Sequence, residues 1–299
     1  MFWLPLLVLW LGLPLGPWLH EAGSCGALAK EVPDNLKQFY RQLRAVGSCH
    51  SVLATGFWDE RTGSNIFAYC GDHLAEYSLM YIQGRQGALA DMDVDCDGVA
   101  GGSADDGRCS VRESPDLQNV TAFQDTLAGY GVAGVTDLDP YVHPYVVFGN
   151  QGAKPNWPTF DPTAYGVHPL SVMAVVCRDG EDLVYGVWGD TNGDNGGYAM
   201  VGEASLALAT ACYGNGMSGA DGHSADDVLY LAFAGPEAVP GAAGADWGAP
   251  DFHAFEQSID ALGDSLVARI ARDSVAAGRA VVGWGVVFVV VLAAGFVAL

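Results

Sequence analysis

The sequence predicts an α+β, β-rich fold: a compact β-barrel with inserted helices and a C-terminal helix packed on the domain. Three observations support this prediction. Several segments rich in Val, Tyr, Phe and Trp are bounded by Gly, Asp or Pro, as strands are. They do not alternate regularly with helical segments, which argues against a parallel doubly wound sheet. An amphipathic segment near the C-terminus has helical spacing.

The expected elements follow in chain order. The predicted strands span residues 88–95, 144–149, 171–177, 182–189 and 227–235. Helical pieces are expected at 75–82, 120–130 and 203–213. A Gly/Ala/Pro-rich stretch, 240–250, is typical of a loop. After it, apolar residues recur at helical spacing over 251–273, at Phe252, Phe255, Ile259, Leu262, Leu266 and Ile270.

Size and charge limit the function. The chain has 299 residues and is 50% hydrophobic, enough for one large or two small domains with a proper core. Its 13 Lys and Arg against 35 Asp and Glu give a formal charge of -22. Such a surface repels nucleic acid and anionic lipid and attracts polycations. We therefore expect no nucleic acid partner, and the sequence leaves the oligomeric state open.

Both ends of the chain are apolar. Residues 1–24 resemble a secretory signal peptide. Residues 280–299 carry no charge and could just span a bilayer, and with the spacer from 272 they resemble a GPI-attachment signal or a membrane anchor. The sequence thus predicts a catalytic domain over 25–271 that is extracellular, either released or held at the cell surface through the C-terminal tail.

Seven cysteines agree with an oxidising compartment. No CxxC pair occurs, which disfavours a zinc ribbon. Six cysteines can pair and one is left over, for which Cys25 is the candidate; the connectivity stays open, with Cys96–Cys109 as the local expectation. Asn119 begins an N-glycosylation sequon, so we expect a glycoprotein.

The sequence matches known metal-binding and catalytic motifs poorly. The chain lacks HExxH, GxSxG and P-loop sequences, and its histidines are scattered. Two Asp-rich segments, from Asp93 and from Asp190, resemble calcium loops, but neither has the glutamate required at position 12. A looser calcium site remains open, built from Asp91, Asp93, Asp95 and Asp97.

A pair of carboxylates is the stronger candidate for chemistry. Asp190 ends an apolar strand and enters a Gly/Asn-rich turn, and Glu203 follows apolar Met200 and Val201 before a helical run. An apolar setting would raise the pKa of Glu203 while a polar turn keeps Asp190 ionised, as glycoside hydrolysis requires. The alternative is that Asp190 is a turn residue and Glu203 a helix-cap residue.

The segments LADMDVDCDG (89–98), PYVVFGN (144–150), YGVWGDTNGDN (185–195) and VGEASLALATACYG (201–214) occur in order and resemble the fungal chitosanases of glycoside hydrolase family 75. The resemblance spans roughly 49–271. It implies endo-hydrolysis of β-1,4 bonds in chitosan with inversion, with Glu203 as general acid and Asp190 as general base, and no cofactor or metal. The strand and turn at 183–190 also resemble the active-site corner of double-psi β-barrels, an analogy of fold alone.

Chitosan would explain the charge, since its amines are protonated at mildly acidic pH. We expect carboxylates to pair with those amines and aromatic rings to contact sugar faces: Asp91, Asp93, Asp95 and Asp97 for the first role, and Tyr145, Trp188 and Tyr198 for the second. The competing class is a non-catalytic, calcium-stabilised glycan-binding protein of the cell surface.

Overall fold

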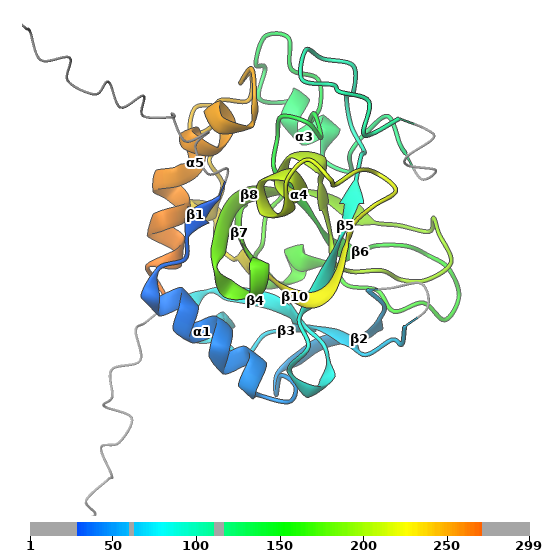
Figure 1. The fold of residues 1–299 in the computed structure, drawn as a ribbon, viewed down its shortest axis with the longest axis vertical. Coiled ribbons are helices and arrows are strands. Elements are labelled where there is room, and N and C mark those ends of the chain that lie inside the picture. The colour runs from blue at the N-terminus through cyan, green and yellow to red at the C-terminus, as the bar shows by residue number, and fades with distance from the viewer. Residues whose placement is uncertain (1–28, 60–62, 111–116, 271–299) are drawn as a thin grey trace, which may run out of the picture.

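A computed structural model describes residues 29–59, 63–110 and 117–270. Its centre is a closed barrel of six strands (Figure 1). Around the ring these are β8 (Asp182–Asn192), β6 (Tyr145–Asn150), β9 (Glu203–Ser205), β5 (Ala90–Asp95), β10 (His223–Phe233) and β7 (Val172–Cys177). The β5–β9 and β6–β8 pairs are parallel and the other four are antiparallel, so the barrel is mixed.

Further strands extend the barrel. An antiparallel ribbon pairs with β10 through β4 (Leu79–Gln83), followed by β3 (Phe67–Cys70) and β2 (Val52–Phe57). Beyond β7, the other neighbour of β10 in the ring, β1 (Lys30–Glu31) pairs with the start of β8. The prediction of a β-rich α+β barrel is confirmed.

The strands alternate between two packed layers. Met173, Val175 and Trp188 belong to the layer inside the barrel, whereas Val172, Ala174 and Val187 belong to the layer outside it. The outer layer also contains the apolar faces of two helices, α1 (Asp34–Ala45) and α5 (Phe252–Val267). In Figure 1 these helices cover one side of the barrel, and β5 and β6 lie on the other.

The two ends of the described residues lie close together, beside α1 and α5. The Asn35 side chain of α1 donates hydrogen bonds to the carbonyls of Val267 and Ile270, both at 3.0 Å. Lys30 of β1 forms ion pairs with Asp260 and Asp264 of α5, at 3.1 and 2.9 Å. The first and last described segments therefore lie side by side against β7 and β8.

The remaining helices are short. They are α2 (Leu74–Tyr77), α3 (Gln124–Ala128), α4 (Leu206–Tyr213) and the 3-10 turns Arg85–Gly87, Pro162–Tyr165, Arg178–Gly180 and Pro236–Ala238. The helix expected at 75–82 is wrong over its second half, because Leu79–Gln83 forms β4 and all five of its residues are buried. The helix expected at 203–213 begins only at Leu206, since Glu203–Ser205 pairs as β9.

Six cysteines form three disulfides: Cys49–Cys70, Cys96–Cys109 and Cys177–Cys212. The local expectation for Cys96 and Cys109 is confirmed. Cys25, the expected odd cysteine, lies outside the described residues, as do the expected signal peptide and C-terminal anchor. Within the described ranges, no helix is both long and apolar enough to cross a membrane.

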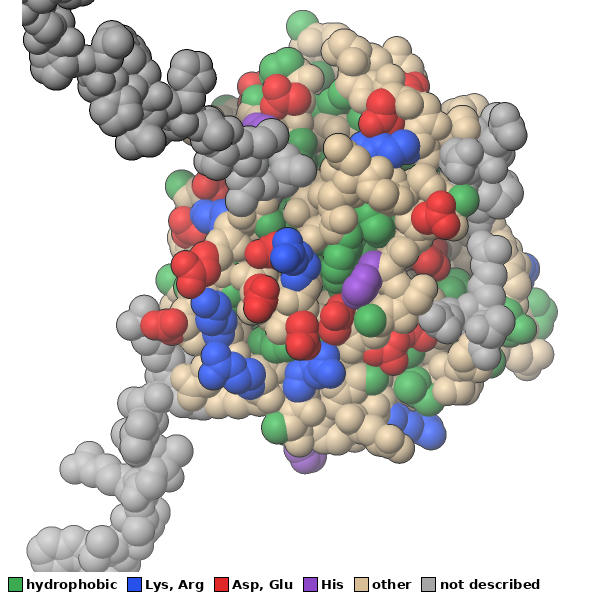
Figure 2. Space-filling view, viewed as in Figure 1, with side chains coloured by type: hydrophobic (Ala, Val, Ile, Leu, Met, Phe, Trp, Pro, Cys, Tyr) green, Lys and Arg blue, Asp and Glu red, His purple; other side chains and the backbone are tan. Residues whose placement is uncertain are grey.

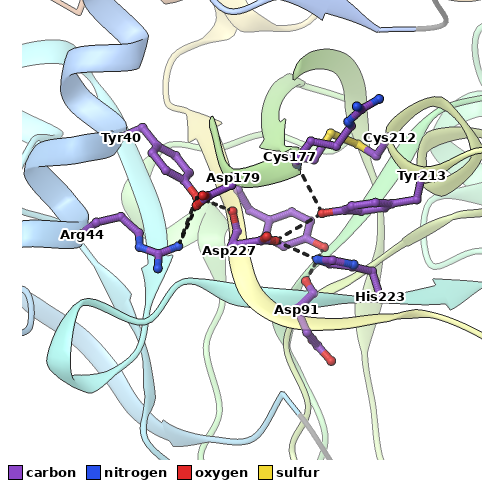
Figure 3. Close-up of polar contacts among 11 residues, drawn as sticks. Tyr40, Arg44, Asp91, Cys177, Asp179, Cys212, Tyr213, His223 and Asp227 are labelled. Atoms are coloured by element: carbon purple, nitrogen blue, oxygen red, sulfur yellow. Dashed lines mark hydrogen bonds and ion pairs between the residues drawn. A yellow bond between two sulfur atoms is a disulfide. The ribbon is translucent and has the colours of Figure 1, made fainter. Parts of the chain in front are cut away.

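A polar network braces the start of β10 (Figure 3). The Asp227 carboxylate accepts a hydrogen bond from the Tyr213 hydroxyl at 3.3 Å and contacts His223 Nε2 at 2.8 Å. The Tyr213 ring stacks on His223, with centroids 3.9 Å apart. Tyr40 of α1 donates to the Asp227 carbonyl at 2.7 Å. These contacts tie α1 and α4 to the segment of β10 that reaches the cleft described below.

Glu256 of α5 is a buried acid whose removal is expected to stabilise the fold at neutral pH. Burial, with the charge of Asp260, raises its pKa from 4.5 to about 7. The folded state therefore binds the proton more tightly, and stability falls as pH rises from 4.5 to about 7. Glu256→Gln removes a penalty of about 3 kcal/mol at pH 8 and none at pH 4. Chemical denaturation at both pH values measures this; an equal effect at both would contradict it.

Candidate active site

Four side chains form a row across neighbouring strands on the outer face of the barrel. Val147 of β6 is the register partner of Asp190 on one side and of Glu203 on the other. Glu203 in turn pairs with Asp93 of β5. Directly paired residues point to the same face of a sheet, so the three carboxylates share one surface. Two strand spacings place the Cα atoms of Asp190 and Glu203 about 10 Å apart.

A β-bulge at Gly189 places Asp190 on this face. Trp188 pairs with Val146, and Asp190 pairs with the very next residue, Val147. Consecutive residues on β6 point to opposite faces, so Trp188 turns into the barrel and Asp190 turns out. Only glycine fits at the bulge, because a Cβ there would lie 2.5 Å from both Leu138 Cδ1 and Tyr145 Cβ.

Asp190 lies in a buried, hydrogen-bonded setting and is 6% exposed. Its Oδ1 accepts the backbone N–H groups of Thr191 at 2.7 Å and Ala122 at 3.0 Å. Burial raises its pKa to about 7; these two hydrogen bonds oppose the rise and the charges of Asp97 and Asp137 add to it. Asp190 therefore exchanges its proton near neutral pH.

Glu203 is the more accessible member of the pair. Its Oε2 accepts a hydrogen bond from the Asn192 side chain, which also donates to the Met200 carbonyl at 3.1 Å. It precedes α4 by three residues, and Ser205 caps that helix by accepting from Leu208 N–H. Glu203 is thus a strand residue of the cleft rather than the helix cap. The sequence predicts an apolar setting for Glu203 and a polar one for Asp190. The structure reverses this, because Asp190 is the more buried of the two, where the bulge brings it against Ala122.

The row lies in a cleft of about 780 Å³. All charged side chains among its described lining residues are acidic: Asp91, Asp93, Asp95, Asp97, Asp190, Asp194 and Glu203. Gly222 and Ser224, beside the braced His223, form part of its wall. Lys and Arg instead gather elsewhere, over α1 and β1 on the face shown in Figure 2. The cleft is therefore a negative groove suited to a cationic ligand.

Three of these carboxylates are close neighbours. Oxygens of Asp95, Asp97 and Asp190 lie within 4.8 Å of one another. Burial and the charges of Asp190 and Glu203 raise the pKa of Asp95 well above its usual range. The looser calcium site considered from the sequence is not reproduced as such, because Asp91 and Asp93 fall outside this cluster and Asp190 joins it. Such a cluster suits a shared proton as well as a cation.

Of the three aromatic residues expected to contact sugar, two are buried and one is exposed. Trp188 and Tyr145 are fully buried and cannot touch a sugar, which corrects that expectation; they support the site instead. Trp188 Nε1 donates to the Asp190 carbonyl at 2.9 Å, and the Tyr145 hydroxyl donates to the Asp97 carbonyl at 2.7 Å. Tyr198 is 39% exposed and lines a side lobe of the cleft. Trp58, which sequence reasoning did not single out, packs against it with its ring tilted by 35°.

Comparison with known proteins agrees with this geometry. Residues 92–269 match the family described as fungal chitosanase of glycosyl hydrolase group 75. The chain belongs to this family. It is 43% identical to an endo-chitosanase of Aspergillus oryzae over 258 residues, covering 84% of this chain and 98% of the relative. It is 44% identical to endo-chitosanase B of the same fungus and 43% identical to an endo-chitosanase of Aspergillus fumigatus, each over 245 residues, covering 81% of this chain and 93% of each relative.

Membership makes this chain a glycoside hydrolase and confirms the resemblance found in its sequence. The matched region of the glycosyl hydrolase group 75 family includes both Asp190 and Glu203, and it begins just after Asp91. The relatives match nearly over their full lengths, so the barrel and the cleft fall within the shared part.

Proposed function

We propose that this protein is an endo-chitosanase that cleaves β-1,4 bonds between glucosamine units with inversion. The observation that supports this most is the placement of Asp190 and Glu203 on either side of Val147, at the floor of an acidic cleft. A separation of about 10 Å between their Cα atoms suits the wider carboxyl spacing of inverting enzymes, which leaves room for a water. The relatives named endo-chitosanase support the substrate class.

In this mechanism Glu203 protonates the glycosidic oxygen and Asp190 deprotonates the attacking water. The pKa of Asp190, about 7 without ligand, would keep it protonated in mild acid. Ammonium groups bound along the cleft oppose this, because a nearby positive charge favours the carboxylate. Substrate binding would therefore help to ionise the base. The same ammonium groups pair with Asp93, Asp95 and Asp97, which line the cleft, whereas Asp91 is only 2% exposed and one of its carboxylate oxygens is buried.

The test is hydrolysis of fully deacetylated chitosan, followed by reducing-end release, viscosity and proton NMR of the first products. We expect an early drop in viscosity, as internal cleavage requires, and α-configured new reducing ends, as a single displacement requires. New ends formed as the β-anomer would contradict the inverting mechanism. Glycan binding without cleavage, lost on calcium chelation, would instead support the non-catalytic alternative, for which the Asp95–Asp97–Asp190 cluster is the motivating observation.

Asp97→Asn is expected to extend activity to lower pH. The charge of Asp97 helps to raise the pKa of Asp190, and a base is active only when ionised. Activity of the wild type should fall as pH drops through the pKa of Asp190, and removing the neighbouring charge moves that limb downward. The shift is measured as the pH at which kcat/KM for a short glucosamine oligomer falls on the acid side of its profile. A limb that stays in place or moves upward would contradict the assignment of Asp190 as base.

A further inference from the structure

An aromatic pair with tilted rings lies at the side of the cleft next to Glu203. The rings of Trp58 and Tyr198 have centroids 4.5 Å apart and planes inclined by 35°. Tyr198 is 39% exposed, one of the few large apolar side chains left open among the described residues, and Trp58 is half-buried beside it. An aromatic ring open to solvent and held by a second ring is a candidate platform for a sugar face.

Trp58 is attached by backbone hydrogen bonds to the segment that leads into β9, the strand that carries Glu203. Trp58 N–H donates to the Ala199 carbonyl at 3.0 Å, and Val201 N–H donates to the Trp58 carbonyl at 2.8 Å. These bonds form a parallel bridge between Trp58 and Met200. The position of the Tyr198 ring is therefore coupled to Glu203 through only a few residues of extended chain.

Tyr198 lines a small space that Glu203 also lines. A side lobe of about 30 Å³ is lined by Tyr198, Asp93, Asn192 and Glu203, among others. Three of these, Asp93, Asn192 and Glu203, also line the main cleft, so the two spaces adjoin. The lobe is too small for a sugar, so a ring lying on Tyr198 would cover its mouth, with the Asp93 carboxylate lining the space beneath the ring. An apolar face beside a carboxylate matches glucosamine, which has an apolar ring face and a cationic substituent.

We propose that Tyr198, held in place by Trp58, is the platform for the glucosamine unit next to the scissile bond, and that Asp93 pairs with the ammonium group of that unit. This inference rests on the proposed function. Tyr198 contacts the sugar directly, whereas Trp58 is a positioning residue that acts through the Tyr198 ring. The subsite selects for a free amine at one defined position along the polymer.

Tyr198→Ala tests the platform. We expect KM for a short glucosamine oligomer to rise about tenfold with kcat changed little, because stacking contributes to binding and not to proton transfer. Tyr198→Phe should keep the wild-type KM, and Trp58→Ala should resemble Tyr198→Ala. Tyr165→Ala is the matched control: Tyr165 is 38% exposed and stacks on Phe160, with centroids 5.5 Å apart, and it is not among the residues lining the cleft.

Asp93→Asn tests amine recognition on partly acetylated chitosan, with product ends sequenced by mass spectrometry. Wild type should leave glucosamine at one of the two new ends, and the variant should also accept N-acetylglucosamine there. The proposed subsite is wrong if wild type and Tyr165→Ala cleave chitosan while Tyr198→Ala keeps a wild-type KM. It is also wrong if the products of Asp93→Asn carry the same sugar at the new ends as the products of the wild type. If neither wild type nor Tyr165→Ala cleaves chitosan, the proposed function itself fails.

Discussion

Asp190→Asn and Glu203→Gln are each expected to lower kcat for chitosan by about a thousandfold or more while leaving the fold intact, because each removes one half of the proposed acid/base pair. Both changes are nearly isosteric. The amide oxygen introduced at position 190 can still accept the N–H groups of Thr191 and Ala122, and the amide introduced at position 203 can still contact Asn192. Reducing-end assays together with melting temperatures measure the two consequences separately.

The roles within the pair can be separated by azide, which attacks without a general base. Azide should restore turnover in Asp190→Asn with an α-glucosaminyl azide product, and should not rescue Glu203→Gln on chitosan, whose leaving group still needs a proton. If azide restored turnover only in Glu203→Gln, Glu203 would be the general base and Asp190 the general acid. Asp125→Asn and Glu181→Gln are controls, since both acids are exposed and neither lines the cleft. If either control is as inactive as the pair, the loss is not specific to the site.

Gly189→Ala is expected to destabilise the barrel and to lower activity. The added Cβ would lie 2.5 Å from Leu138 Cδ1 and Tyr145 Cβ, and the Tyr145 atom is fixed by the backbone of β6. The strand must shift, which costs about 1–3 kcal/mol or more as overpacking does. The bulge that turns Asp190 outward would shift with it, so activity should fall even at temperatures where the variant stays folded.

Gly216→Ala is the matched control, because a Cβ at that position meets nothing within 4 Å. Both variants are compared by thermal melting and by kcat on chitosan at a temperature well below the lower melting point. A Gly189→Ala protein with normal stability and normal kcat would show that the bulge tolerates a side chain. Such a result would also weaken the link between the bulge and the orientation of Asp190.

Much of the barrel could be predicted from local pattern. The five predicted strands all occur, because each is an apolar run punctuated by Gly, Asp or Pro. The first helix, Asp34–Ala45, was missed although it buries Leu36, Phe39 and Leu43 at helical spacing. The segment at 75–82 was misassigned since Leu79–Gln83 has no alternation: buried on both faces, its pattern does not separate strand from helix.

Residue type and family resemblance single out the proposed catalytic pair, but its geometry is beyond sequence reasoning. Nothing local shows that Val147 separates Asp190 from Glu203, because that pairing joins three segments far apart in the chain. From the sequence, Trp188 and Tyr145 are candidates for sugar contacts, because an aromatic side chain can serve either as a sugar platform or in the core. Only the register shows that Trp188 turns inward, and Trp58 lay too far along the chain to be associated with Tyr198.

The closeness of Ala29 and Ile270, the two ends of the described residues, has a practical consequence. Ala29 and Ile270 lie on the side of the barrel formed by β1, β7 and β8, where Asn35 binds the two end segments together, whereas β5 and β9 stand across the ring. A resin, a fusion partner or a particle coupled at either of these two positions would approach the side of the barrel opposite β5 and β9. Immobilised molecules would all present the same open groove outward, free to thread a long polymer.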